Sequence, residues 1–168
     1  KQLIKHTNGV YVLTEMRGAI YAMCARNGRN KEFNALTALY RKTEMHEETG
    51  RIGNALGDFK DPKIQIQTCE FARSSNVRSQ NTESILSSVG MNPLGRDIWL
   101  QFIKSNWKKL MTQYGGGNHQ LPRVVKAISA SPEPKHFSAY KKFFATHEAP
   151  GAARSIDQVM ERMESNIA

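Results

Sequence analysis

Apolar residues recur along the chain at the three- and four-residue spacing of one face of an α-helix. Patterns that alternate between apolar and polar residues, which are typical of strands, are nearly absent. The spacing predicts roughly nine helices joined by short turns. The residues predicted to form their buried faces are Met16, Ile20, Met23 and Cys24; Phe33, Leu36, Leu39 and Tyr40; Met45, Ile52, Leu56 and Phe59; Ile85, Leu86 and Val89; Trp99, Phe102, Ile103, Trp107, Leu110 and Met111; Leu121, Val124, Val125 and Ile128; Phe137, Tyr140, Phe143 and Phe144; and Ile156, Val159, Met160, Met163 and Ile167.

Residues that favour turns separate these apolar stretches. Asn27-Gly28 is a typical helix stop. Asp61 followed by Pro62 is a typical helix start, because Asp accepts a backbone hydrogen bond at an N-cap and Pro fits the first turn. Asn92-Pro93 closes a further helix, and the glycines at 115–117 end the longest one. This order of helices and turns predicts an all-α fold.

Successive antiparallel helices with short loops are typical of HEAT and armadillo proteins. No strict sequence period is visible, so we expect an irregular α-solenoid of about nine antiparallel helices, a single helical domain over residues 1–168, and not a closed bundle. Such a stack leaves one concave face free for a partner. The chain begins with Lys1, and its first segment has the apolar residues Leu3, Ile4, Val10, Tyr11, Val12 and Leu13. We therefore expect it to be the C-terminal part of a larger chain whose first solenoid helices lie upstream.

The composition is compatible with a globular domain. Apolar residues make up 39% of the 168 residues, the mean hydropathy is −0.55, and no apolar run reaches the length of a membrane helix, so we expect no transmembrane segment. Cys24 and Cys69 are too few for a disulfide framework and too far apart for a CxxC site. We expect both to be buried free thiols, and the lack of a disulfide pattern slightly favours a cytoplasmic location.

One short motif begins like the zinc-binding signature HExxH. The segment His46-Glu47-Glu48-Thr49-Gly50 has Gly where that signature needs its second His, one helical turn after the first. We therefore expect no metal site there but a solvated first helical turn, where acidic side chains favour the helix dipole. We expect no catalytic residue and no metal ligand in this segment.

The charge is strongly positive, with 24 Lys and Arg against 15 Asp and Glu and a net charge of +9. Much of it falls in a later basic cluster that contains a single acid, Glu133. Such a cluster could bind nucleic acid phosphates, but the neighbouring aromatic residues occupy the predicted core, so nucleic acid is not the expected partner. The basic members of the cluster are Lys104, Lys108, Lys109, Arg123, Lys126, Lys135, Lys141 and Lys142.

The sequence also carries family-like motifs over nearly its whole length. The stretch from Arg96 to Ala168, with Trp99 and Trp107 on one helix and Tyr114 before the glycines, resembles the C-terminal helical domain of zinc aminopeptidases of the aminopeptidase N and puromycin-sensitive aminopeptidase type. The segments 17–21, 77–81 and 123–128 are similar to that family as well. The resemblance implies a HEAT-like bowl that covers the active site and forms the wall of a substrate chamber.

The resemblance also implies where the chemistry lies. The parent enzyme would be a zinc metallopeptidase that removes N-terminal residues from peptides. Its zinc and the ligands of that zinc would belong to an upstream catalytic domain that packs against this one. The segment by itself is then non-catalytic, and its partners are that domain and, through it, peptide substrates. Arg78 and Gln80 are the candidate substrate-binding residues of the inner wall, because Arg can grip a peptide carboxylate in a bidentate manner.

Two alternatives stay open at this point. The first is local: Arg78 and Gln80 could instead satisfy buried carbonyl groups at a helix turn. The second concerns the whole chain, which could be a stand-alone basic α-solenoid that binds a protein or a nucleic acid.

Overall fold

The structure, a computed structural model, describes residues 3–5, 11–116 and 119–168, and shows a stack of helices. The α-helices in these ranges are α1 (Arg17–Asn27), α2 (Asn30–Lys42), α3 (His46–Leu56), α4 (Pro62–Ala72), α5 (Ser79–Met91), α6 (Arg96–Tyr114), α7 (Gln120–Lys126), α8 (Pro134–Phe144) and α9 (Ala153–Ile167). Short 3-10 helices, η1 (Thr14–Met16), η2 (Pro93–Gly95) and η3 (Pro150–Ala152), precede α1, α6 and α9. The predicted all-α fold is confirmed.

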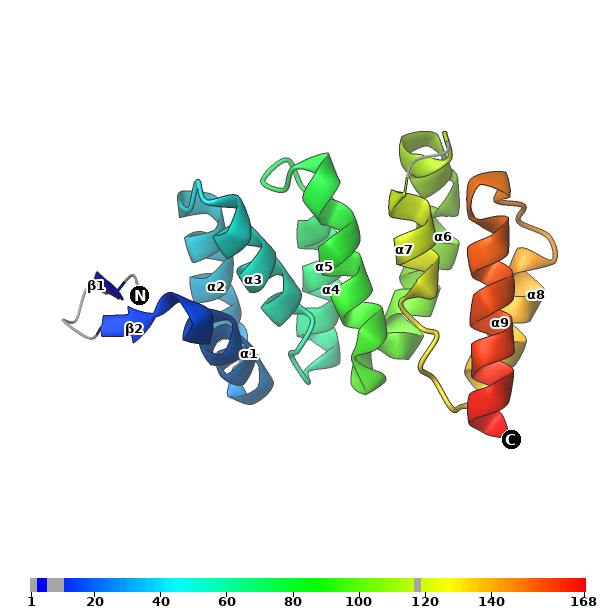
Figure 1. Cartoon of the computed structure of the whole chain (residues 1–168), viewed down its shortest axis with the longest axis horizontal. Helices are drawn as coiled ribbons and strands as arrows, with labels where there is room; N and C mark the ends of the chain where they lie inside the picture. Colours follow the sequence, from blue (N-terminus) through cyan, green and yellow to red (C-terminus); the bar gives the residue numbers. More distant parts are fainter. Residues whose placement is uncertain (1–2, 6–10, 117–118) are drawn as a thin grey trace.

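The apolar start of the chain forms an element that the sequence pattern did not predict. Strands β1 (Leu3–Lys5) and β2 (Tyr11–Leu13) pair antiparallel, with Leu3 opposite Leu13. Each strand has only three residues, too few for a clear alternating pattern. The hairpin lies at one end of the stack, and the C-terminus lies at the other end (Figure 1).

The helices are arranged in two layers along the long axis of the molecule (Figure 1). Each odd-numbered helix from α1 to α7 packs on the next odd-numbered helix, and in the second layer α6 contacts α4 on one side and α8 on the other. Across the layers, α2 packs on α3, α4 on α5, and α8 on α9. The odd-numbered helices are in closer mutual contact than the even-numbered ones. This is the arrangement of an irregular α-solenoid.

The predicted helix ends are largely confirmed. The Asp61 carboxylate accepts a hydrogen bond from the Lys63 amide at 2.8 Å and caps α4, whose first residue is Pro62. Gly28 follows the last residue of α1, and Gly115 caps α6. Gly117, the third glycine of the predicted stop, lies outside the described residues.

The helices approach closely where their side chains are small. A Cβ atom on Gly57 would lie 2.4 Å from the Ser88 carbonyl carbon, so the end of α3 can touch the backbone of α5 only with glycine at this position. The Asn92 amide donates hydrogen bonds to the Gly57 and Phe59 carbonyls at 2.8 and 3.0 Å. These contacts fix the α3–α4 turn against the α5–α6 turn.

A continuous core runs between the two layers. Trp99, Tyr114 and Tyr140 are its largest fully buried side chains. Trp107 of α6 meets the Phe143 and Phe144 rings of α8 edge to face, with centroids 5.4 and 5.2 Å apart. Such geometry adds about 1 kcal/mol per pair beyond the buried area. The predicted apolar faces of α2, α5, α6 and α7 largely lie in this core, as expected.

The predicted face of α1 is wrong. Met16, Met23 and Cys24 are exposed, and the helix instead buries Arg17, Tyr21 and Ala25. The reason is tertiary, because α1 turns its polar residues towards a buried carboxylate on α3, as described below. Met45 is also exposed, since it precedes the first turn of α3. The second cysteine, Cys69, is buried as predicted, and burial raises its pKa to about 12.

None of the helices in the described residues combines the length and the apolar character required to span a bilayer.

Candidate functional site

Arg78 lies where three helix ends meet at one edge of the stack. It is the N-cap residue of α5, in an extended backbone conformation, and its side chain is exposed. The end of α2, the start of α3 and the α4–α5 turn surround it. Together they enclose a cavity of about 220 Å³, lined by Tyr40, Arg41, Thr43, Glu44, His46, Thr49, Asn76, Arg78 and Asn81. We call this cavity the Arg78 cavity.

The Arg78 cavity is favourable for an anion. Its lining holds the cations Arg41 and Arg78 against the single acid Glu44. The first turns of α3 and α5 border it, and helix N-termini carry partial positive charge and free amide groups. A carboxylate placed there would meet two guanidinium groups and two helix dipoles.

The polar groups of the Arg78 cavity differ in how firmly they are held. The Asn81 amide, which is buried, donates a hydrogen bond to the Tyr40 hydroxyl at 3.1 Å, and this bond joins α5 to α2. Arg41 stacks over the Phe71 ring, with 5.5 Å between its guanidinium carbon and the ring centroid. The Arg78 side chain forms no hydrogen bond or ion pair with the described part of the chain. Its guanidinium therefore remains free for a ligand.

The second predicted residue, Gln80, does not line this cavity. It lies in the first turn of α5 and is exposed, and its side chain makes no hydrogen bond to the described residues. Neither Arg78 nor Gln80 satisfies a buried carbonyl within the described ranges, so that alternative finds no support. Sequence reasoning missed Thr43, Thr49 and Asn76 as lining residues, because they are distant in sequence and polar residues at turns are common.

A buried ion-pair cluster lies next to the N-terminal end of the odd-numbered layer. Glu48 of α3 accepts hydrogen bonds from Tyr21 of α1 and from Arg51, and it pairs with Arg17 at 3.3 Å. Arg17 and Glu48 are each about 5% exposed. The Nε and Nη2 atoms of Arg17 are buried and have no hydrogen-bond partner among the described residues.

The cluster shifts the pKa values of its members in opposite directions. Burial alone would raise the pKa of Glu48, but the hydrogen bonds from Tyr21 and Arg51, together with the charges of Arg17 and Arg51, outweigh it. The pKa of Glu48 therefore lies below its usual value. Burial and the Glu48 carboxylate raise the pKa of Tyr21 far above its usual value. Glu48 is thus a structural anion that holds α1 against α3.

The buried ion-pair cluster includes Glu48, which is also part of the HExxH-like segment. Glu47 is exposed and pairs with Arg51 at 3.3 Å, as expected for a solvated first turn. The same expectation is wrong for Glu48, which is buried against Arg17, whereas His46 is exposed. The described residues contain no group of three His, Cys, Asp or Glu side chains that could hold a metal ion. This segment does not fit zinc.

A Ser–His–Asp chain that sequence reasoning missed joins α6 to α8. His136 is buried, with Nδ1 2.7 Å from the Ser131 hydroxyl and Nε2 2.9 Å from the Asp97 carboxylate. The three residue types are those of a hydrolase triad, but the ring nitrogens are exchanged, because a triad serine bonds Nε2 and the triad acid bonds Nδ1. The Ser131 hydroxyl is also fully buried and unreachable for a substrate. We interpret these hydrogen bonds as structural contacts that hold α8 against α6.

The basic cluster of the later half is divided between two layers. Lys104, Lys108 and Lys109 lie on α6, and Lys135, Lys141 and Lys142 lie on α8, whereas Arg123 and Lys126 belong to α7. Arg123 pairs with Glu83 at 3.4 Å. Over the helices as a whole, the even-numbered layer carries eleven basic and three acidic residues, against seven and six in the odd-numbered layer. The net positive charge therefore lies almost wholly on one side.

Comparison with known proteins identifies the family. Residues 1–165 match the family model described as the ERAP1-like C-terminal domain. The chain is 25% identical to aminopeptidase N of Mus musculus and 23% identical to aminopeptidase N of Homo sapiens, each over 99% of this chain. It is 28% identical to aminopeptidase M1 of Arabidopsis thaliana over 89% of this chain. The chain spans about 18% of the length of these aminopeptidase N relatives.

The family match confirms the resemblance drawn from the motifs around Trp99, Tyr114 and Arg78. The family model matches nearly every residue of the chain, and several aminopeptidases are relatives of it. The two-layered helical stack agrees with both findings. The chain belongs to the ERAP1-like C-terminal domain family and is a C-terminal helical domain of the aminopeptidase N type.

Proposed function

We propose that the chain is the non-catalytic C-terminal domain of a zinc-dependent aminopeptidase that removes N-terminal residues from peptides. The family match supports this proposal, together with the absence of a usable metal-ligand set among the described residues. In this role the domain packs against a catalytic domain, covers its active site and forms part of the wall of the substrate chamber. The zinc and its chemistry then belong to the catalytic domain.

We further propose that the Arg78 cavity receives the C-terminal carboxylate of the peptide substrate. The observation that carries this step is the free, exposed Arg78 guanidinium beside Arg41 at the N-termini of α3 and α5. A guanidinium binds a carboxylate through two parallel hydrogen bonds. Gln80, one residue into the same helical turn, lies near enough to the start of α5 to contact the peptide chain that leads to this carboxylate.

The packing of the layers supports a particular inner face. In a curved stack of two layers, the layer with the closer helices lies on the inside of the bend. The odd-numbered helices are in closer contact here, so we assign them to the concave wall. This places the Glu83–Arg123 pair on the chamber side, and Lys104, Lys108 and Lys109 on the outer side.

The test compares peptide acids with peptide amides in an enzyme that carries this domain. Arg78→Ala should raise KM for a free-acid peptide about fivefold, because an exposed charge-assisted hydrogen bond contributes about 1 kcal/mol. The same peptide with a C-terminal amide should show no change, and neither should a single amino-acid amide. Lys31→Ala, an exposed change on α2 away from the cavity, is the matched control. An equal effect on acid and amide would refute the carboxylate assignment.

The alternative function, a stand-alone basic solenoid, is favoured by one observation. The even-numbered layer concentrates the positive charge on one face, as a polyanion-binding surface would. Fluorescence anisotropy with a labelled single-stranded oligonucleotide at several salt concentrations tests this alternative. Binding that weakens steeply with salt would support it, and no binding at low salt would dismiss the nucleic-acid version.

A further inference from the structure

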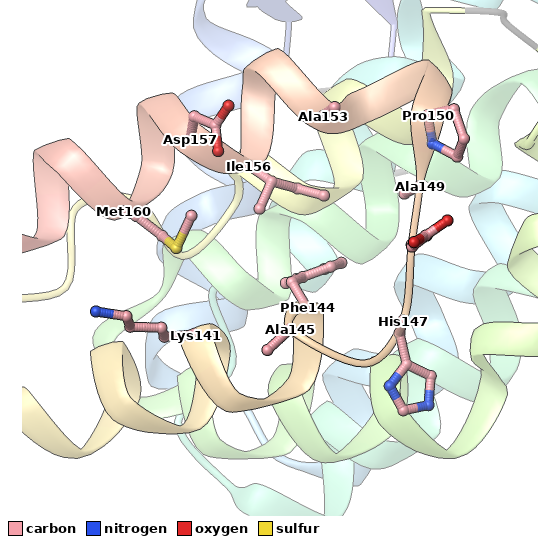
Figure 2. Close-up of a pocket in the computed structure, with 11 residues that line it drawn as sticks. Lys141, Phe144, Ala145, His147, Ala149, Pro150, Ala153, Ile156, Asp157 and Met160 are labelled. Carbon is pink, nitrogen blue, oxygen red and sulfur yellow. The ribbon is translucent and has the colours of Figure 1, made fainter.

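A second cavity, far from Arg78, lies between α8 and α9 at the C-terminal end of the stack. Its volume is about 470 Å³, which is within the usual range for small-molecule sites. Figure 2 shows Phe144 on α8 facing Ile156 and Met160 on α9, with the segment that carries Ala149 and Pro150 closing one end. We call this cavity the α8–α9 cleft.

The walls of the α8–α9 cleft are mainly apolar. Phe144 and Met160 are partly exposed, and Ile156 and Ala149 are buried beneath them. A ligand with an apolar body would cover the exposed parts of these side chains. Covering apolar surface contributes about 25 cal/mol per Å² removed from water. An apolar body alone, however, would give little selectivity.

Selectivity comes from the charged rim. Asp157 on α9 and Glu148 in the connecting segment line the cleft, and neither forms a salt bridge with the described residues. Lys141 on α8 is the single Lys or Arg in the lining, and its ammonium already lies over the Phe137 ring, 5.6 Å from the centroid. His147 is held by stacking on Phe143, at 4.1 Å between centroids. The rim is therefore acidic, in a chain whose net charge is +9.

We propose that the α8–α9 cleft binds a small organic cation with an apolar body, of the arylalkylamine class. The ring would pack between Phe144 and Met160, and the Asp157 and Glu148 carboxylates would attract the ammonium. Lys141 forms no salt bridge with either carboxylate in the described residues, because its own ammonium lies over the Phe137 ring. This inference does not depend on the aminopeptidase role, because the cleft shares no lining residue with the Arg78 cavity.

The test uses three probes that separate the contribution of the apolar ring to binding from that of the ammonium. 4-Phenylbutylamine carries both a ring and an ammonium, n-butylamine lacks the ring, and 4-phenylbutyrate carries a carboxylate in place of the amine. Titration of the 168-residue chain by protein-observed NMR should give saturable binding of 4-phenylbutylamine about tenfold tighter than either comparison compound. The shifted resonances should belong to residues that line the cleft.

Two variants test the proposed contacts. Asp157→Asn combined with Glu148→Gln should weaken 4-phenylbutylamine binding about fivefold and leave the weak binding of 4-phenylbutyrate unchanged or improved. Glu161→Gln, an exposed change on α9 outside the lining, is the control and should bind as the parent chain does. All three positions are exposed, so these variants should fold, which circular dichroism verifies.

The proposal is overturned by any of four results. They are equal affinity for 4-phenylbutylamine and 4-phenylbutyrate, unchanged affinity of the double variant, the lack of saturable binding up to the solubility of the amine, or resonance shifts confined to the Arg78 cavity. None of these results affects the peptide acid and amide comparison, so the two proposals fail separately.

Discussion

Removal of the Glu48 carboxylate should destabilise the fold more than most single surface changes. In Glu48→Ala, Arg17 stays buried, with about 5% of its side chain exposed, and loses the carboxylate that balances its charge. The Tyr21 hydroxyl loses its hydrogen-bond acceptor. Breaking a buried ion pair from one side costs about 3 to 5 kcal/mol. Arg51 is partly exposed and can still pair with Glu47, so it adds little to the cost. We therefore expect a loss of about 3 kcal/mol in the free energy of unfolding.

The assay is urea unfolding followed by circular dichroism, arranged as a double-mutant cycle. Arg17→Met and Glu48→Leu together should be less destabilising than the sum of the single changes, because no uncompensated charge remains buried. Glu47→Ala is the matched control, since this neighbouring carboxylate is exposed, and it should cost less than about 0.5 kcal/mol. Additive single effects, or a Glu48→Ala cost as small as that of Glu47→Ala, would refute the reasoning.

The pH dependence of stability follows from the same cluster. The pKa of Glu48 is lowered in the folded state from a usual value of 4.5, so the unfolded chain binds its proton first as the pH falls. The stabilisation by Glu48 is therefore complete above the unfolded pKa. It is lost as the pH falls below about 4.5 and through the lower folded pKa. Glu48→Ala should flatten this part of the curve of unfolding free energy against pH.

Two further predictions concern packing and the thiols. Gly57→Ala should lower the free energy of unfolding by about 2 kcal/mol or more, because the new methyl group would overlap the backbone of α5; an unchanged urea midpoint would contradict this close approach. A thiol reagent such as Ellman's reagent should modify Cys24 rapidly and Cys69 only after unfolding, because Cys24 is exposed whereas Cys69 is buried with a pKa raised to about 12. Cys24→Ser should then abolish the rapid phase, and a rapid phase that persists in this variant would show that Cys69 is accessible.

Much of the fold could be predicted because helix periodicity and helix ends are local properties. The spacing of Phe33, Leu36 and Tyr40 and the cap at Asp61-Pro62 gave the correct elements, since each depends on residues within one or two turns. The exposed Cys24 and the buried Arg17 were not predictable in this way. Their placement depends on Glu48, which is distant along the chain.

In the candidate site, too, local sequence predicts some features, and contacts between distant residues determine the others. Arg78 was identified from a local motif, and it does lie in a cavity, whereas Gln80 from the same motif does not line it. The remaining lining residues come from three segments, and only the stacking of α2, α3 and α5 brings them together. The α8–α9 cleft left no sequence signal at all, because Phe144, Ile156 and Met160 have the spacing of ordinary core residues.

Helix periodicity and family motifs are properties of neighbouring residues, so the amino-acid sequence alone predicts a stack of amphipathic helices related to aminopeptidase C-terminal domains. The packing of the helices in space is needed to know which side of each helix is buried, which charges are paired, and where cavities remain. Those properties depend on the layer into which a helix packs. The net charge of +9 shows this most clearly, since its concentration on the even-numbered layer arises from the alternation of helices between two layers.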